Sequence, residues 1–190
     1  NTTNGSSSPL YVNFSVYADG VYYYNVTTRD LANNVNHTET RNITIDTVVP
    51  AVTINFPAVN NTIYGINNLP VIFNVTLSEN GSVIYSLNGG VNNVSMRGDQ
   101  GSFGTVFNST NSSIADGTYI VSFYANDTLG NRNYTQTTTF RFDGTAPNVT
   151  INLPTNTTYT SVPIIFNVTL GENGSVMYSL DSGVNNVTLL

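Results

Sequence analysis

The sequence predicts an all-β protein built from tandem β-sandwich repeats of about 95 residues each. Three observations lead to this fold class. Apolar residues alternate with polar ones in short runs, turn-forming residues separate these runs, and whole segments of the 190-residue chain recur. No apolar stripe with the period of a helix interrupts the pattern.

Two sets of sequence matches define the repeat. Ala-Asp-Gly-Val-Tyr at residues 18–22 returns as Ala-Asp-Gly-Thr-Tyr at 115–119, a shift of 97 residues. Phe-Asn-Val-Thr-Leu at residues 73–77 returns unchanged at 166–170, a shift of 93 residues, because a loop is shorter in the later copy. We therefore expect the second half of one repeat at residues 1–46, a complete repeat at 47–143 and the first half of a further repeat at 144–190.

Within the complete repeat, period-2 alternation marks the strands. The residues expected to face the core are Phe73, Val75, Leu77, Val83, Tyr85, Leu87, Tyr119, Val121, Phe123, Ala125, Phe140 and Phe142. Turn signals such as Asn-Gly-Gly at 88–90 and Leu-Gly-Asn at 129–131 separate the runs. Whether the step at residues 80–81 is a tight hairpin or a crossing between sheets is left open by the sequence.

The number and length of these strands are typical of an immunoglobulin-like sandwich. The segment entering Tyr119 also resembles the tyrosine corner that precedes the sixth strand of such folds. The strings Tyr-Ala-Asn-Asp-Thr-Leu-Gly-Asn at 124–131 and Phe-Asp-Gly-Thr-Ala-Pro at 142–147 resemble the Ig-like repeats of bacterial and archaeal surface proteins. The Asn/Thr-rich background is similar to the archaeal versions. Such repeats occur in S-layer proteins, adhesins, stalks and accessory parts of secreted enzymes, so the resemblance implies an architecture and not an activity.

The composition excludes several function classes. Only 8% of the residues are charged, lysine is absent, and the net charge is −6, so a nucleic-acid partner is not expected. There is no cysteine for disulfides or thiolate sites, and no apolar run is long enough to span a membrane. The chain begins with Asn-Thr-Thr-Asn and no initiating methionine, so we expect a segment of a longer protein.

The strongest chemical signal is Asn-x-Ser/Thr, the acceptor sequence for N-glycosylation, which occurs more often than chance predicts. An Asn/Thr-rich outer strand face produces part of this excess through alternation alone. A sugar coat would also explain the scarcity of charge. We expect N-linked glycans at several of the candidate sites, which are Asn13, Asn25, Asn36, Asn42, Asn60, Asn74, Asn80, Asn93, Asn108, Asn111, Asn126, Asn133, Asn148, Asn156, Asn167, Asn173 and Asn186.

Metal, catalytic and cofactor sites are not expected. Asp30, Asp46, Asp127 and Asp143 lie at loops or junctions without paired carboxylates in sequence, and capping of turns is the favoured role over calcium binding. His37, the only histidine, has Tyr134 as its repeat counterpart, and Glu79 and Glu172 each lack a second carboxylate nearby in sequence. In the run Tyr22-Tyr23-Tyr24, alternation predicts core positions for the first and third tyrosines.

We therefore expect a non-enzymatic, extracellular, cell-surface protein: a glycosylated filament, S-layer or stalk segment. Neighbouring copies or repeats of the same protein would complete the half-repeats at the two ends. An adhesin that binds carbohydrate or cells is one alternative, and it predicts an exposed aromatic cluster that only one unit carries; the sequence alone reveals none. An accessory region of a secreted enzyme is another.

Overall fold

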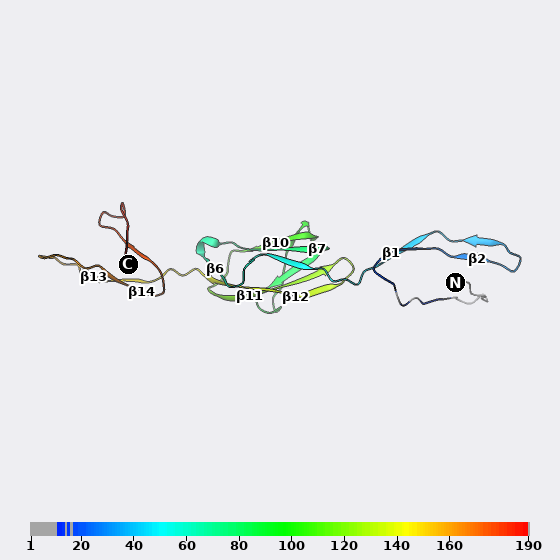
Figure 1. The fold of residues 1–190 in the computed structure, drawn as a ribbon, viewed down its shortest axis with the longest axis horizontal. Helices are drawn as coiled ribbons and strands as arrows, with labels where there is room; N and C mark the ends of the chain where they lie inside the picture. The colour runs from blue at the N-terminus through cyan, green and yellow to red at the C-terminus, as the bar shows by residue number, and fades with distance from the viewer. Residues whose placement is uncertain (1–10, 14, 16, 190) are drawn as a thin grey trace.

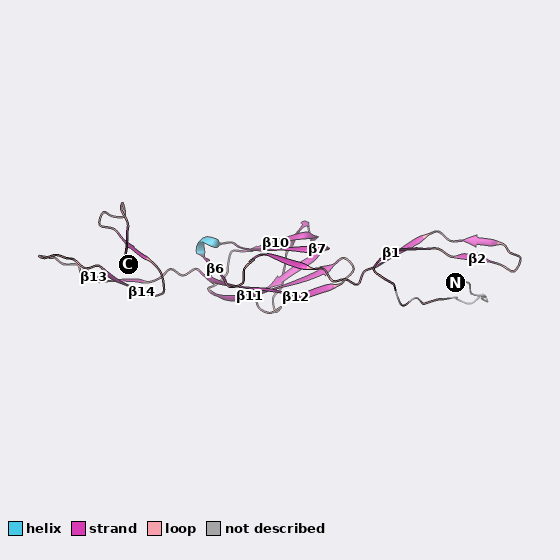
Figure 2. Ribbon diagram, viewed as in Figure 1, coloured by secondary structure: helices cyan, strands magenta, loops and turns pink. Residues whose placement is uncertain are grey.

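The computed structural model describes residues 11–13, 15 and 17–189 of the chain. These residues form strands and one short 3-10 helix (Figure 2). Figure 1 shows three parts in a row: N-terminal hairpins at one end, a central sandwich, and a C-terminal segment at the other end. The strands and their packing confirm the predicted all-β fold with an immunoglobulin-like β-sandwich.

The N-terminal part contains two pairs of strands, one nested inside the other. Its strands are β1 (Gly20–Tyr24), β2 (Thr27–Arg29), β3 (Val35–His37) and β4 (Arg41–Ile45). β1 pairs antiparallel with β4, and β2 pairs antiparallel with β3. Together they form one long, irregular hairpin whose tip is the loop between β2 and β3 (Figure 1).

The central sandwich contains β5 (Val52–Phe56), β6 (Thr62–Gly65), the 3-10 helix η1 (Ile66–Asn68), β7 (Val71–Ser86), β8 (Val94–Ser95), β9 (Arg97–Gln100), β10 (Phe103–Asn111), β11 (Gly117–Asp127) and β12 (Arg132–Asp143). The strands form one hydrogen-bonded network in the order β6-β12-β11-β7-β10-β9, and β5 and β8 also pair with β7. All these pairs are antiparallel except β6 with β12.

Strand β7 connects the two layers of the sandwich. Its first half pairs with β5 and β10, and its second half pairs with β8 and β11. The crossing lies at Gly81, where an added Cβ would lie 2.4 Å from the backbone oxygen of Asn126, so only glycine fits. The Asn80-Gly81 step is therefore a crossing between sheets and not a hairpin.

The core lies between these layers and is dominated by aromatic rings. Phe73, Phe107, Phe123 and Phe140 are all fully buried, and Phe73 stacks on Tyr85 with ring centroids 4.5 Å apart. Each such ring removes about 150–250 Å² from water. Alternation predicted these core positions on β7, β11 and β12, whereas Phe107 on β10 was not identified.

The tyrosine corner is also confirmed. The Tyr119 hydroxyl donates to the backbone oxygen of Ala115 at 2.8 Å, and this bond fixes the entry into β11. The N-terminal part contains the same bond, from the Tyr22 hydroxyl to the backbone oxygen of Ala18 at 2.7 Å. The repeated sequence therefore produces repeated local structure.

The C-terminal part contains β13 (Val149–Leu153), β14 (Asn167–Leu170), β15 (Val176–Tyr178) and β16 (Val187–Leu189). β13 pairs with β14, and β15 pairs with β16. The pair Val149↔Leu170 matches Val52↔Leu77 of the central sandwich at the shifts of 97 and 93 residues. The same equivalence holds for β1–β4 of the N-terminal part and β11–β12.

No helix with the length and apolar character needed to cross a membrane occurs among the described residues.

Candidate functional site

Three carboxylates meet where the N-terminal part joins the central sandwich. We call Asp46, Glu79 and Asp127 the junction cluster; a carboxylate oxygen of each lies within 4.8 Å of the other two. Asp46 follows β4, Glu79 lies at the bend of β7, and Asp127 ends β11. The register Asp127↔Gly81 between β11 and β7 brings the last two together.

Asp127 is the most deeply buried member of the junction cluster. It is 2% exposed, and its Oδ1 accepts backbone N–H bonds from Leu129, Gly130 and Asn131, at 2.6–2.9 Å. Desolvation alone would raise the pKa of Asp127, but the hydrogen bonds from Asn131, Leu129 and Gly130 together lower it below the ordinary value. This carboxylate caps its loop, as predicted, and stays ionised at neutral pH.

The pKa of Glu79 is shifted in the opposite direction to that of Asp127. Desolvation, followed by repulsion from the charges of Asp46 and Asp127, raises the pKa of Glu79 above its ordinary value. Three converging carboxylates are the hard oxygen donors that Ca²⁺ prefers, although that ion takes six to eight oxygens in all. The junction cluster thus offers three of the oxygens that such a shell would need, and the absence of metal sites stays a prediction from the sequence.

Sequence reasoning missed this cluster because its members are far apart in the chain. Asp46 itself behaves as expected, accepting the Val48 N–H at 3.1 Å. Asp30 caps its loop through Asn34, and these bonds lower the pKa of Asp30. Asp143 is instead paired with Arg141, at 2.8 Å. One signal in the sequence could have pointed to the junction cluster: Glu79 recurs as Glu172 in a chain with few charges.

The candidate glycosylation sites fall into two groups by exposure. The exposed asparagines are Asn13, Asn25, Asn36, Asn42, Asn60, Asn80, Asn93, Asn108, Asn148, Asn156, Asn167, Asn173 and Asn186; the half-buried ones are Asn74, Asn111, Asn126 and Asn133. Oligosaccharide attachment takes place at Nδ2, so that atom decides whether a site is available.

Two of the half-buried amides already use their Nδ2 atoms. Asn133 Nδ2 donates to the backbone oxygen of Pro50 at 2.9 Å and so ties β12 to the start of the unit. Asn74 Nδ2 donates to Asn108 Oδ1 on the neighbouring strand β10. By contrast, Asn60 Oδ1 accepts two bonds from residues 138 and 139, and no bond of its Nδ2 is found among the described residues.

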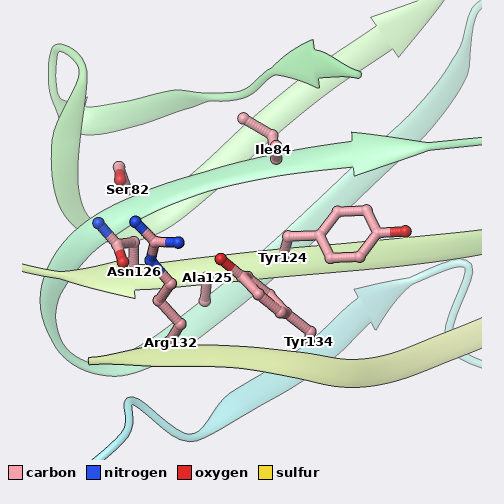
Figure 3. A pocket seen from close by; sticks show the side chains of 7 residues that line it. All are labelled: Ser82, Ile84, Tyr124, Ala125, Asn126, Arg132 and Tyr134. Atoms are coloured by element: carbon pink, nitrogen blue, oxygen red, sulfur yellow. The ribbon is translucent and has the colours of Figure 1, made fainter. Parts of the chain in front are cut away.

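A shallow concavity of about 250 Å³ lies on the outer face of β7, β11 and β12 (Figure 3). We call it the tyrosine concavity; it is lined by Ser82, Ile84, Tyr124, Ala125, Asn126, Arg132 and Tyr134. The rings of Tyr124 and Tyr134 meet edge to face with centroids 5.5 Å apart. Figure 3 shows Arg132 and Asn126 side by side next to this pair.

Polar groups in the tyrosine concavity are available for further hydrogen bonds or ion pairs. The Asn126 Oδ1 atom is buried without a hydrogen-bond partner, and the ion pairs found among the described residues do not include Arg132. The N-terminal counterparts of the two tyrosines are Thr27 and His37, so the N-terminal part lacks the aromatic pair. The sequence does not reveal this cluster, because the contact depends on the register between β11 and β12 beside their loop.

Of the residues considered for catalysis in the sequence, Glu79 belongs to the junction cluster, whereas His37 and Glu172 do not. The His37 ring, exposed on β3, hydrogen-bonds through Nδ1 with the Thr27 hydroxyl at 3.0 Å. Glu172 is exposed in the C-terminal part. Tyr22 is half-buried, whereas Tyr23 and Tyr24 are 73% and 47% exposed.

Comparison with known families supports the Ig-like assignment. Residues 102–181 match the family described as "Bacterial Ig-like domain (group 3)". The match covers less than half of the chain and runs from the central sandwich into the C-terminal part. The chain therefore contains an Ig-like segment similar to that bacterial family.

Solved structures with a similar arrangement include an engineered protein, at 18% sequence identity and a TM-score of 0.39, which matches 52% of this chain and 21% of its own. Another is a modular endo-β-1,4-mannanase from Cellulomonas fimi, at 17% identity and a TM-score of 0.37, with 54% and 20% covered. The match spans about a fifth of the length of each of these proteins. No curated protein sequence matches the chain.

Proposed function

We propose that this chain is a structural segment of a glycosylated extracellular assembly at the cell surface, such as a filament, an S-layer or a stalk. The observation that carries the proposal is the periodic register: strand pairs of both terminal parts match those of the central sandwich at shifts of 97 and 93 residues. Identical units that follow one another along a chain or fibre contact only their neighbours and suit a spacing role.

The surface chemistry supports an extracellular location. Most candidate glycosylation sites are exposed, and glycans would wet a surface on which charged residues are scarce. The match of residues 102–181 to a bacterial Ig-like family agrees with a surface role. The Asn/Thr-rich composition leads us to propose the archaeal type of these repeats. The proposal assigns no catalytic step, cofactor or nucleic-acid partner to the chain.

The tyrosine concavity favours a second candidate function, the binding of carbohydrate. Tyr134 is 53% exposed and offers a ring face to the apolar side of a sugar, while Arg132 offers donors to hydroxyl or carboxylate groups. Because the N-terminal part lacks the pair, a binding role would belong to the central sandwich and not to every repeat.

Electron cryo-microscopy of the native material tests the structural proposal. We expect fibres or sheets with an axial repeat of Ig-like units and with sugar density at exposed asparagines such as Asn60 and Asn167. Mass spectrometry of glycopeptides identifies the occupied sites independently. Isolated, unglycosylated monomers in native preparations would contradict the proposal.

A further inference from the structure

One candidate glycosylation site lies inside the tyrosine concavity. The acceptor sequence Asn-Asp-Thr at residues 126–128 begins at the end of β11 and continues into the loop before β12. Asn126 is half-buried and lines the concavity, whereas Thr128, which completes the acceptor sequence, is exposed. The acceptor sequence and the aromatic pair therefore belong to one surface.

The pairing of the strands gives Asn126 a defined set of neighbours. Asn126 lies opposite Ser82 on β7 and opposite Arg132 on β12. Two residues earlier on β11, Tyr124 points to the same face, because side chains alternate along a strand. A group attached to Asn126 is therefore flanked by a small hydroxyl side chain, a guanidinium and an aromatic ring.

Contacts around the two tyrosines hold their rings in position. Tyr124 and Tyr134 meet edge to face with centroids 5.5 Å apart. A Cβ added at Gly90 would lie 3.1 Å from the Tyr124 hydroxyl, so the turn after β7 lies against the end of this ring. Tyr134 is 53% exposed and offers its ring to a sugar. A platform that is already ordered loses little conformational freedom when a sugar packs on it.

The side-chain amide of Asn126 makes no hydrogen bond in the described part of the chain. Its Oδ1 atom is buried and unpaired, and Figure 3 shows the amide next to the guanidinium of Arg132. By contrast, the Nδ2 atoms of Asn133 and Asn74 donate hydrogen bonds within the sandwich. The Nδ2 atom of Asn126 is thus available for attachment of a glycan. Hydroxyl groups of a sugar at this position can donate to the polar groups around it, which buried acceptors require.

Comparison with the N-terminal part links the asparagine to the aromatic pair. At the shift of 97 residues the counterpart of Asn126 is Arg29, and the counterparts of the two tyrosines are Thr27 and His37. The acceptor asparagine and the aromatic pair therefore occur together in the central sandwich and are absent together from the N-terminal part.

We propose that Asn126 carries an N-linked glycan whose first sugar packs on the rings of Tyr124 and Tyr134, so that a glycan of this chain itself occupies the tyrosine concavity. This inference rests on the proposed function, in which the chain is glycosylated. The apolar C–H face of the sugar and the tyrosine rings remove each other from water. Arg132 donates to the oxygens of the sugar. The glycan then stabilises the folded sandwich, and foreign carbohydrate reaches the concavity only in the unglycosylated chain.

Attachment exchanges one bond at the sugar for another. The donor is an oligosaccharide joined to a lipid through phosphate, which the cell supplies together with the transferase. A bond forms between Nδ2 of Asn126 and the anomeric carbon, and the bond from that carbon to the phosphate oxygen breaks. The lipid phosphate leaves with the electron pair, and the amide loses one proton.

Glycopeptide mass spectrometry of the native protein tests occupancy. We expect a glycan on the peptide that contains residues 126–128. An unmodified Asn126 in a protein that carries glycans at other asparagines would overturn this inference and leave the proposed function standing. A native protein without any glycan would contradict both.

Thermal unfolding tests whether the glycan packs on the protein. The full chain is produced with verified occupancy at Asn126 in a host that attaches N-linked glycans, and without glycans in a host that does not. Thr128→Ala removes the acceptor sequence and leaves the lining of the concavity in place. Thr110→Ala is the matched control, because it removes the acceptor sequence of Asn108 on β10 at a threonine that is also exposed.

We expect Thr128→Ala to lower Tm of the glycosylated chain by about 4–8 °C, the scale of one aromatic contact in a unit of this size. The same substitution should leave Tm of the unglycosylated chain unchanged, and Thr110→Ala should have little effect on either chain. Equal effects of Thr128→Ala on the glycosylated and unglycosylated chains would overturn the stabilising role of the glycan.

Substitutions of Tyr134 test the ring as the contact. The quantity measured is the gain in Tm, the difference between the glycosylated and the unglycosylated chain of each variant. Tyr134→Ala should abolish this gain, whereas Tyr134→Phe keeps the ring and should keep the gain. Both variants should fold, because half of the Tyr134 side chain is exposed. A gain that survives Tyr134→Ala unchanged would overturn the packing of the sugar on the tyrosine pair.

Discussion

Alanine substitutions at two equivalent phenylalanines compare the packing of the central sandwich with that of the C-terminal part. Phe73 is fully buried and packs against Tyr85 and Phe140, so Phe73→Ala should lower the free energy of unfolding by about 3–5 kcal/mol. Its counterpart Phe166 is half-buried and retains the stack on Tyr178. In the monomer, Phe166→Ala should therefore cost less than Phe73→Ala, because part of the Phe166 ring is already in contact with water.

The assay is thermal and urea unfolding at a dilute concentration where the chain is monomeric, followed by circular dichroism and tyrosine fluorescence. For a unit of this size, each kcal/mol shifts Tm by about 4–8 °C, so Phe73→Ala should lower Tm by at least about 12 °C. Phe73→Leu serves as a milder variant if Phe73→Ala does not fold. Equal losses from Phe73→Ala and Phe166→Ala in the monomer would refute the reasoning, because they would mean that the C-terminal half is packed as tightly as the central sandwich.

Three further predictions concern the surface sites. Because the pKa of Glu79 is raised, its protonated form stabilises the fold below the ordinary pKa of 4.5 and this stabilisation is lost as the pH rises. Glu79→Gln should thus raise Tm at pH 7 in EDTA and raise it little at pH 4, and the exposed Glu172→Gln serves as the control. A lower Tm of Glu79→Gln at pH 7 would contradict the raised pKa of Glu79 and its causes, desolvation and repulsion from Asp46 and Asp127. Glycopeptide mass spectrometry should find Asn60 modified and Asn133 unmodified, because Asn133 Nδ2 is bonded to a backbone oxygen; the reverse pattern would show that glycosylation precedes folding there. Tyr134→Ala should weaken any retention on immobilised glycans by about fivefold, given about 1 kcal/mol for one aromatic contact, and unchanged retention would exclude the tyrosine concavity as the binding site.

The strands could be predicted from the sequence because alternation is a local property. Phe73, Val75 and Leu77 share a face whatever the rest of the chain does, and burial then follows from the pairing of strands. The repeats strengthened this prediction, since a match at 97 or 93 residues fixes equivalent registers in separate parts. Phe107 was missed because its strand, β10, has a weaker apolar pattern interrupted by Asn and Ser.

The candidate sites depend on contacts that no local pattern reveals. The junction cluster exists because β7 crosses between the sheets at Gly81 and brings Glu79 next to the end of β11. The sequence left this crossing open between two geometries, and a hairpin at the same step would have paired different residues. The contact between Tyr124 and Tyr134 depends on the register of β11 with β12 beside their loop, where Asn126 pairs with Arg132.

The abundance of asparagine has two physical explanations, amide ladders between strands and N-glycosylation, and the structure shows the first of them. On the outer sheet face, Asn55 Nδ2 donates to Asn74 Oδ1 and Thr76 Oγ1 at 2.5 and 2.8 Å, a ladder that satisfies amides with other side chains. Asn152 makes the same two bonds in the C-terminal part, to residues 167 and 169. In both ladders the asparagine of the acceptor sequence accepts through Oδ1. Its Nδ2 is the atom to which a glycan would attach, so the partner of Nδ2 distinguishes the two explanations. Asn74 uses that atom within the sheet, which favours cohesion between strands. One sequence pattern therefore produces both amide ladders and glycosylation acceptor sequences, and glycan attachment at the latter stays a prediction.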